Sequence, residues 1–273
     1  MQVAIIGAGA YGTALGRIIT KNNHAVDYFD NGRPDHTLEQ ATRGADIIII
    51  AVPSSAIGDL LTTYPENLRS IPTIIATKGI LSATIFDGFT HLSAFSGPSF
   101  AAELNIDKPT TITATSGIIK SLLGTDWLTI EPTDDIAGLF ACGSLKNIYA
   151  IGSGLLGLEN DDTTLAIYIE KTLAELRVLL PAFGGSPDTA DLACGIGDLI
   201  LTCSSSQSRN YQYGAALASD PNFTPDQTTE GLSTAQSLPG NLYRPPILQA
   251  IVDIIENHAP IDTLLGAITH DEA

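Results

Sequence analysis

The sequence predicts an α/β protein: a doubly wound parallel sheet over residues 1–133, followed by an all-helical domain over residues 134–273. Strand and helix patterns alternate through the first part, which is typical of parallel sheets covered on both faces. A glycine-rich turn joins the first strand to the first helix. After Glu131–Pro132–Thr133 the strand pattern stops and helical periodicity takes over.

Composition narrows the class of protein. The chain of 273 residues can form two domains, and 44% of its residues are hydrophobic. It carries 13 basic and 30 acidic side chains, and the net charge of −17 argues against a nucleic-acid binder. No apolar run reaches the length of a membrane helix, which is roughly 18 residues. The three cysteines form no CxxC pair, so we expect a reducing cytosol, neither disulfides nor a metal site, and small buried thiols.

The first strand, within Met1–Gly7, runs directly into a GxGxxG turn and a helix. This order of elements is the fingerprint of a Rossmann dinucleotide-binding fold. Its glycines permit a tight turn, close approach to a pyrophosphate and helix–strand packing. The free N–H groups of the helix N-terminus then face the phosphates. The residues expected to contact the cofactor here are Gly7, Gly9, Ala10, Tyr11 and Gly12.

The second strand, Ala25–Phe29, ends at Asp30. A carboxylate at this place can accept hydrogen bonds from the adenine ribose, and it favours NAD over NADP. Asp30 could instead be only a turn residue before Asn31–Gly32. The nearby Arg33 leaves NADP possible as the cofactor.

The remaining strands are predicted at residues 45–52, 73–76, 92–95, 110–114 and 127–130. Four consecutive isoleucines, Ile47–Ile50, indicate a central strand covered on both faces. Polar or turn residues follow the strands at the edge where such sheets bind ligands, namely Pro53, Lys78 and the loop Ser96–Ala101. Lys78 could equally be a solvated loop lysine.

Helices are predicted in the second domain at residues 134–157, 163–183, 189–204, 207–218, 231–237 and 246–258. The first of them carries Lys146 in an otherwise apolar stretch. A lone ammonium in such a stretch either extends to water at the helix edge or is held inside a site by partners, because burying it unpaired is costly.

Two further sets of residues in this domain suit a polar site. Asp198 and Thr202 are four residues apart and share one helix face, although Asp198 could simply cap its helix. Arg209 and Asn210 start a helix after Ser208, where a guanidinium, an amide and helix N–H groups can converge on a phosphate. Arg209 could also be a surface residue behind a Ser208 cap.

Six motifs in order resemble the NAD-dependent glycerol-3-phosphate dehydrogenases, and they extend from Ile5 to about Gly231. Besides the glycine-rich turn they are the stretches 76–79, 96–101, 142–152, 197–203 and 208–210 together with Glu230–Gly231. A single GxGxxG would fit many dehydrogenases, whereas this series is specific.

The resemblance implies reduction of dihydroxyacetone phosphate to sn-glycerol 3-phosphate with NAD(P)H. Lys146 would be the proton donor, Lys78 a second cation, and Asp198 a member of the catalytic set. The implied substrate-binding residues are Lys78, Gly97, Ser99, Asn147, Thr202, Ser208, Arg209 and Asn210. Further implied cofactor contacts are Asp30, Pro53, Lys78, Ala101, Arg209 and Glu230.

The resemblance also implies a homodimer in the cytoplasm that supplies glycerol phosphate for phospholipid synthesis. One departure from the family is the segment between Asp30 and Asp46, which is shorter than usual and lacks an expected excursion with a further strand. A 3-hydroxyacid or ketopantoate-type reductase is an alternative, since it also has a lysine-bearing helical domain. A nucleotide-binding regulator without turnover is another.

Overall fold

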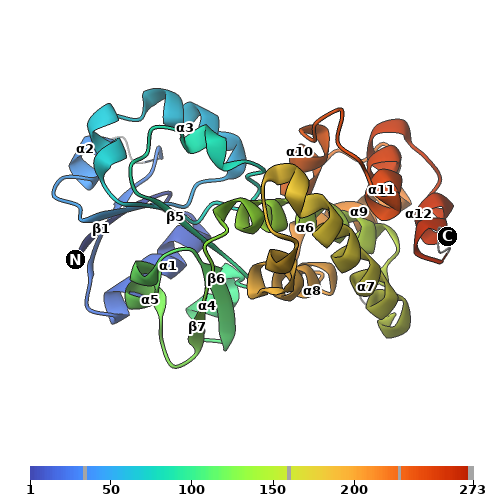
Figure 1. Ribbon diagram of the computed structural model, residues 1–273, viewed down its shortest axis with the longest axis horizontal. Coiled ribbons are helices and arrows are strands. Elements are labelled where there is room, and N and C mark those ends of the chain that lie inside the picture. Colours follow the sequence, from blue (N-terminus) through green and yellow to red (C-terminus); the bar gives the residue numbers. More distant parts are fainter. Residues whose placement is uncertain (33–35, 159–160, 227–228, 270–273) are drawn as a thin grey trace. The chain divides into compact units, whose positions relative to one another are not determined.

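A computed structural model describes residues 1–32, 36–158, 161–226 and 229–269 (Figure 1). The chain forms two compact units. The sheet unit comprises Met1–Lys78 and Ala83–Ile136, and the helical unit comprises Gly79–Ser82 and Ala137–Ala273. Arg33, which left NADP possible as the cofactor in the sequence analysis, lies outside the described residues.

The sheet unit contains a seven-stranded sheet of order β2-β1-β3-β4-β5-β6-β7. The strands β1 to β5 are parallel to their neighbours, so their carboxyl ends share one edge. All seven strands occur where the sequence predicts them. Their bounds are β1 Gln2–Ile6, β2 Ala25–Phe29, β3 Ile47–Ile50, β4 Thr73–Ile75, β5 Leu92–Ser96, β6 Thr110–Ala114 and β7 Leu128–Pro132.

Both faces of the central strands are buried, as the isoleucine run predicts. Ile47 and Ile49 pack with one helical layer, and the alternate residues Ile48 and Ile50 are fully buried on the other face. In Figure 1, α1, α4 and α5 cover one face, and α2 and α3 cover the other. The bounds of these helices are α1 Ala10–Lys21, α2 Leu38–Ala41, α3 Ile57–Thr63, α4 Ala101–Asn105 and α5 Gly117–Leu123; short 3₁₀ turns occupy Ser54–Ala56, Glu66–Ser70 and Ala83–Phe86.

The parallel sheet that the sequence predicts is confirmed at every strand pair except one. Strand β6 runs antiparallel to β5, with Phe95 opposite Ala114, while β7 is parallel to β6. The length of the connection does not decide this direction, because residues 97–109 before β6 and residues 115–127 before β7 form connections of equal length and only β7 is parallel to the strand before it. The chain returns beside β5 through residues 97–109, which contain α4.

Strand β2 is an edge of this sheet, because it pairs only with β1. After Asp30 the chain passes through the four-residue α2 and enters β3 on the other side of β1. A capping box fixes the start of α2, with Thr37 Oγ1 accepting from Gln40 N and Gln40 Oε1 accepting from Thr37 N. In the part of this short segment that the structure describes, α2 is the one helix.

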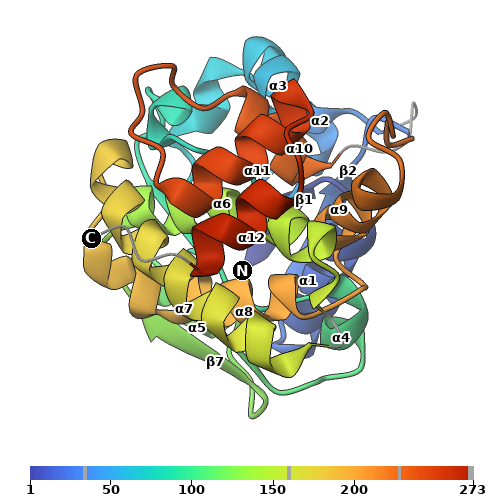
Figure 2. The same ribbon diagram turned by 90° about the vertical axis from the view of Figure 1, so that its right-hand side faces the viewer.

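The helical unit is built around α6, Ile136–Leu155. Every residue of α6 from Gly138 to Leu155 is buried, which is typical of a helix at the centre of a domain. The other α-helices are α7 Asp162–Leu179, α8 Asp198–Cys203, α9 Arg209–Ser219, α10 Glu230–Gln236, α11 Pro246–Asn257 and α12 Asp262–Thr269. Figure 2 shows α11 and α12 packed against each other; α12 was not predicted from the sequence.

Helices α6 and α9 cross with their backbones in contact. A Cβ added at Gly154 would lie 2.0 Å from the carbonyl oxygen of Tyr211, and one added at Gly214 would lie 2.0 Å from that of Ile151. Glycine at both positions is therefore a packing requirement of this crossing.

A buried carboxylate ties α6 to two other helices. Glu175 on α7 is 8% exposed, and it accepts hydrogen bonds from the hydroxyl of Tyr149 on α6 and from the backbone N–H groups of Ile247 and Leu248. The two N–H groups belong to the first turn of α11, where a negative charge is favoured. Burial raises the pKa of the Glu175 carboxyl, although the hydrogen bonds act in the opposite direction. The sequence analysis did not single out this residue.

The helix predicted at residues 189–204 is interrupted in the structure. It consists of a 3₁₀ turn, Pro187–Asp191, a π-helical segment, Ala193–Gly197, and α8. Gly195 permits this change of winding, since a Cβ there would lie 2.1 Å from the carbonyl oxygen of Ala190. The wide turn delivers Asp198 to the start of α8, and π-helical segments of this kind are frequent at functional sites.

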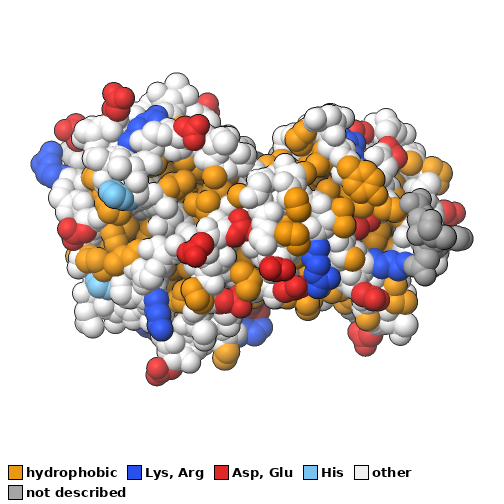
Figure 3. Space-filling view, viewed as in Figure 1, with side chains coloured by type: hydrophobic (Ala, Val, Ile, Leu, Met, Phe, Trp, Pro, Cys, Tyr) orange, Lys and Arg blue, Asp and Glu red, His pale blue; other side chains and the backbone are white. Residues whose placement is uncertain are grey.

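Among the described residues, no helix combines the length and apolarity that a membrane span requires. On the face shown in Figure 3, acidic side chains are spread over both units and are not gathered into one patch. Cys142, Cys194 and Cys203 are small buried thiols, as predicted.

Candidate functional site

The sheet unit has a cavity of about 800 Å³ beyond the carboxyl ends of β1, β2 and β3. It is lined by Gly7 and Gly9 after β1, Asp30 after β2, and Pro53 after β3. This is the edge at which doubly wound sheets bind ligands. Four of the predicted cofactor contacts thus lie around one cavity.

The glycine-rich turn has the shape that a pyrophosphate requires. Gly7 has φ +109°, and a Cβ there would lie 2.6 Å from the carbonyl oxygen of Ala51. A Cβ at Gly12 would lie 1.9 Å from the carbonyl oxygen of Gly7, whereas a Cβ at Gly9 would meet open space. Gly9 is also the N-cap of α1 and makes no side-chain cap, so the first N–H groups of α1, beginning at Ala10, face outward. These residues fit the diphosphate of a dinucleotide.

Asp30 acts as a turn residue and also supports the glycine-rich turn. Its Oδ1 accepts a hydrogen bond from Gly32 N at 2.8 Å, and its Oδ2 accepts one from Ala8 N at 3.1 Å. Each carboxylate oxygen can accept a second hydrogen bond. Asp30 is therefore a turn residue, as the alternative states. Its carboxylate oxygens can still accept hydrogen bonds from a ligand in the cavity.

A second polar group lies after β4 and β5. The ammonium of Lys78 donates to the carbonyl of Gly97 at 2.9 Å, and Ser99 Oγ donates to the same carbonyl at 3.0 Å. The hydroxyl of Tyr11 lies 3.0 Å from Ser99 Oγ, and the Lys78 ammonium lies 6.0 Å from the centre of the Tyr11 ring. Ala101 starts α4 immediately after this loop. Lys78 is thus held by named partners and is not a solvated loop lysine.

In the helical unit, Lys146 is buried and paired. Its side chain is 4% exposed, and its ammonium lies 3.1 Å from Asp198 Oδ1 and donates to Thr202 Oγ1 at 2.7 Å. The Thr202 hydroxyl in turn donates to the carbonyl of Asp198 at 2.6 Å. The alternative of an edge lysine is wrong, and so is that of Asp198 as a simple cap, since its carboxylate faces Lys146. Burial raises the pKa of the neighbouring Cys203 thiol, which keeps it neutral.

Beside this pair, a chain of amide side chains links three helices. Asn147 on α6 donates to Glu230 Oε2 at 3.2 Å and to the carbonyl of Gly143 at 3.1 Å. Asn210 on α9 donates to Asn147 Oδ1 at 2.9 Å, and its own Oδ1 accepts from Gly231 N at 2.9 Å. Both N–H groups of Asn147 are therefore used within the protein, so this residue positions its neighbours.

Arg209 is the first residue of α9, and Ser208 caps that helix by accepting a hydrogen bond from Tyr211 N. Arg209 is exposed, while Asn210 beside it is 7% exposed. An exposed guanidinium next to a helix N-terminus can bind an anion from solution. The predicted residues of the helical unit therefore form two hydrogen-bonded groups, Lys146–Asp198–Thr202 and Asn147–Asn210–Glu230. Ser208 and Arg209 directly precede Asn210 at the start of α9.

Two domain models cover most of the chain. Residues 31–120 match the N-terminal domain, and residues 135–266 the C-terminal domain, of NAD-dependent glycerol-3-phosphate dehydrogenase. The chain is 34% identical to glycerol-3-phosphate dehydrogenase [NAD(P)+] of Paracoccus denitrificans, with 87% of each chain covered. It is 31% identical to the Cereibacter sphaeroides enzyme over 98% of this chain and 93% of that one.

The chain belongs to the NAD-dependent glycerol-3-phosphate dehydrogenase family. Solved structures of this family share its fold. The glycerol-3-phosphate dehydrogenase of Coxiella burnetii superposes with a TM-score of 0.81 at 22% identity, covering 98% of this chain and 99% of that one. The Plasmodium falciparum enzyme gives 0.82 at 17% identity, covering 100% and 96%.

Membership of the glycerol-3-phosphate dehydrogenase family confirms the resemblance read from the six motifs and the predicted class of fold. It also decides against the ketopantoate-type alternative. The motifs that led to this family contain residues that make polar contacts in the structure, such as Lys146 and Asn210.

Proposed function

We propose that this protein is an oxidoreductase that interconverts dihydroxyacetone phosphate and sn-glycerol 3-phosphate with NAD(P)H. The observation that carries the proposal is the buried ammonium of Lys146, held by Asp198 and Thr202 in a chain of this family. A buried ion pair of this kind adds little to stability, because desolvation of the two charges offsets most of their attraction. A role in function therefore explains the pair better than a structural role does.

Lys146 is the proposed general acid. A bound reduced nicotinamide supplies hydride to the C2 carbonyl of the substrate. The C2 oxygen then carries negative charge, and Lys146 gives it a proton and becomes neutral. In the reverse direction the neutral amine takes the proton from the C2 hydroxyl. Asp198 and Thr202 fix the ammonium in place, and Lys78 supplies a second positive charge to the same oxygen.

The phosphate of the substrate is proposed to bind at the start of α9. Arg209 provides the charge, and the N–H groups that follow Ser208 add hydrogen bonds. Asn147 and Asn210 complete the subsite by holding the first turn of α9 against α6. Gly97 and Ser99 are proposed to border the substrate from the sheet unit.

The dinucleotide is proposed to place its diphosphate on the turn from Gly7 to Gly12 and its adenosine in the 800 Å³ cavity beside Asp30 and Pro53. Lys78, Ala101, Arg209 and Glu230 are the proposed contacts toward the nicotinamide. The expected setting is the cytoplasm, with a homodimer as the working assembly and phospholipid synthesis as the use of the product.

The decisive experiment follows NADH consumption with dihydroxyacetone phosphate as substrate, and with ketopantoate as the alternative carbonyl. Turnover with the phosphate ester alone supports the proposal. Tight NADH binding without turnover of either compound would instead indicate a nucleotide-binding regulator and would refute the enzyme assignment.

A further inference from the structure

The cavity in the sheet unit has an acidic wall. Besides Asp30 after β2, two carboxylates belong to its lining, Glu39 on α2 and Asp59 on α3. Among the described residues that line the cavity there is no lysine or arginine. This lining differs from what an additional phosphate would need, since a phosphate group carries roughly −1.5 to −2 charge at neutral pH.

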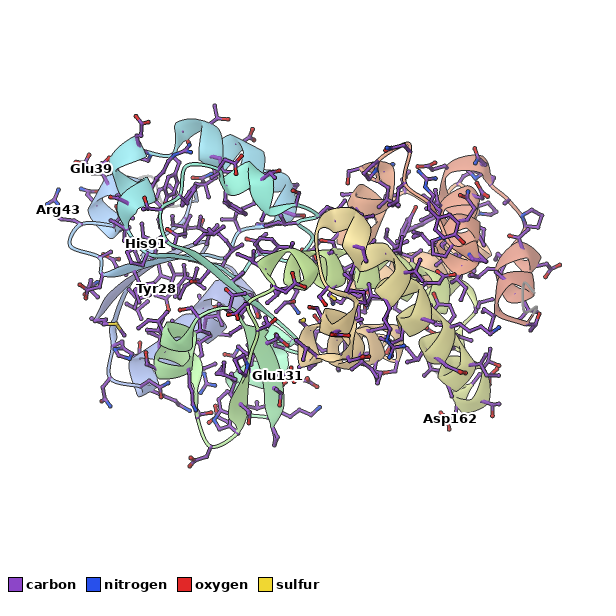
Figure 4. All side chains as sticks on the ribbon, viewed as in Figure 1. Tyr28, Glu39, Arg43, His91, Glu131 and Asp162 are labelled. Carbon is purple, nitrogen blue, oxygen red and sulfur yellow. The ribbon has the colours of Figure 1, made fainter. Side chains whose placement is uncertain are left out.

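Glu39 lines the cavity from the first turn of α2. Helix α2 begins directly after its capping residue Thr37, and Thr37, Leu38 and Glu39 all contribute to the lining. The capping box fixes the first turn of α2 and hence the position of Glu39. Figure 4 labels Glu39 on α2 and Arg43 shortly after this helix; Arg43 is exposed and does not belong to the cavity lining.

The three carboxylates are not equivalent. Asp30 accepts hydrogen bonds from two backbone N–H groups, which partly offset its charge. Glu39 and Asp59 are exposed, so their field acts across the opening of the cavity. Charges in such positions repel a ligand group of the same sign, and dissolved salt screens this repulsion.

We propose that Glu39 is a specificity-determining residue that, with Asp59, disfavours a phosphate on the adenine ribose, so that the protein selects NADH over NADPH. The proposal rests on the proposed function only in taking this cavity as the adenosine site. It concerns discrimination between two dinucleotides and does not depend on which carbonyl compound is reduced.

The test is calorimetric titration of the intact protein with NADH and with NADPH, without any carbonyl substrate. The wild type binds NADH more tightly, and the preference shrinks as ionic strength rises from about 0.01 M to about 1 M. Glu39→Gln tightens NADPH binding by about 3- to 10-fold, as expected for removing one like charge near a phosphate, and leaves NADH binding within about 2-fold. Asp59→Asn acts in the same direction.

The matched control is Asp126→Asn, which changes net charge equally at an exposed position outside the cavity lining. It leaves both affinities unchanged. Equal affinity of the wild type for the two dinucleotides overturns the proposal, as does an equal effect of Glu39→Gln on both. Failure to bind either dinucleotide overturns it too, because the cavity is then not the adenosine site. NADH-selective binding without turnover of dihydroxyacetone phosphate refutes the proposed function and leaves this inference standing.

Discussion

The ammonium of Lys146 lies 3.1 Å from Asp198 Oδ1, and both side chains are buried. Removing one member of such a pair leaves the other as an uncompensated charge away from water. The pair therefore links catalysis to stability, and the two effects can be separated by the choice of variants.

Replacing Lys146 with methionine removes the proposed proton donor and keeps most of the side-chain volume. We expect kcat to fall about 10²- to 10⁴-fold with KM nearly unchanged, because proton transfer acts in the transition state. Steady-state kinetics with dihydroxyacetone phosphate measure this. The exposed Lys120→Met is the control, and a Lys146→Met protein with near-normal turnover contradicts the assignment.

Asp198→Asn should destabilise the fold by about 3–5 kcal/mol, since it leaves the Lys146 ammonium buried without its counter-ion. The double variant Lys146→Met/Asp198→Asn should recover part of that loss, because no charge is then buried. Urea unfolding of the wild type, the two single variants and the double variant provides the free energies. If the double variant loses the sum of both single effects, the two groups do not interact as described.

Arg209→Ala should raise KM for dihydroxyacetone phosphate by about tenfold or more, as expected for losing a charge-assisted contact to a phosphate. Unphosphorylated dihydroxyacetone is the matched substrate. Its kcat/KM should be the same for wild type and variant. An equal loss with both substrates would show that Arg209 does not act on the phosphate.

Gly154→Ala should destabilise the helical unit by about 1–3 kcal/mol or more, because the added Cβ would lie 2.0 Å from the carbonyl oxygen of Tyr211. Helices α6 and α9 would have to separate. Gly117→Ala on α5 is the control, since a Cβ there meets nothing within 4 Å. Thermal unfolding distinguishes the two, and a stable Gly154→Ala protein would show that the helices do not cross so closely.

Stability should depend on pH through Glu175. Burial raises the pKa of this carboxyl above its ordinary value of 4.5, so between 4.5 and the raised value the folded protein keeps a proton that the unfolded chain has released. The contribution is fully present below pH 4.5 and is lost as pH rises through the folded pKa. The free energy of unfolding of wild type, relative to Glu175→Gln, should therefore decline over this range. A constant difference, or one that grows with pH, would contradict the raised pKa.

Much of the fold could be predicted because its signals are local. The isoleucines of β3 and the glycine-rich turn specify a central strand and a strand–helix junction by themselves. The reversal of β6 could not be predicted, since the connections before β6 and before β7 are equally long and only the first leads to an antiparallel pair. The π-helical segment before Asp198 could not be predicted either, because the helical pattern of residues 189–204 does not mark where the winding changes.

The residues of the molecule's polar sites likewise include some that the sequence predicts and some that it does not. Lys146 stood out because a single charge in an apolar helix needs an explanation. Glu175 carried no such signal, because a glutamate in a mixed helix is usually exposed, and its partners lie 26 to 73 residues away along the chain. Glu39 was also missed, since a glutamate in a four-residue helix carries no sequence signal of a place in a cavity lining.

The hydrogen bonds of Glu175 also affect the order in which the two units can fold during synthesis. Two of its three donors are the N–H groups of Ile247 and Leu248, which the ribosome adds more than 70 residues after Glu175 itself. Until they arrive, closing the helical core would bury a carboxylate without them. The sheet unit can fold while the chain is still being made, whereas the unit that carries Lys146 has to wait for α11. A nascent chain would therefore hold a finished nucleotide-binding unit well before it could act on a substrate.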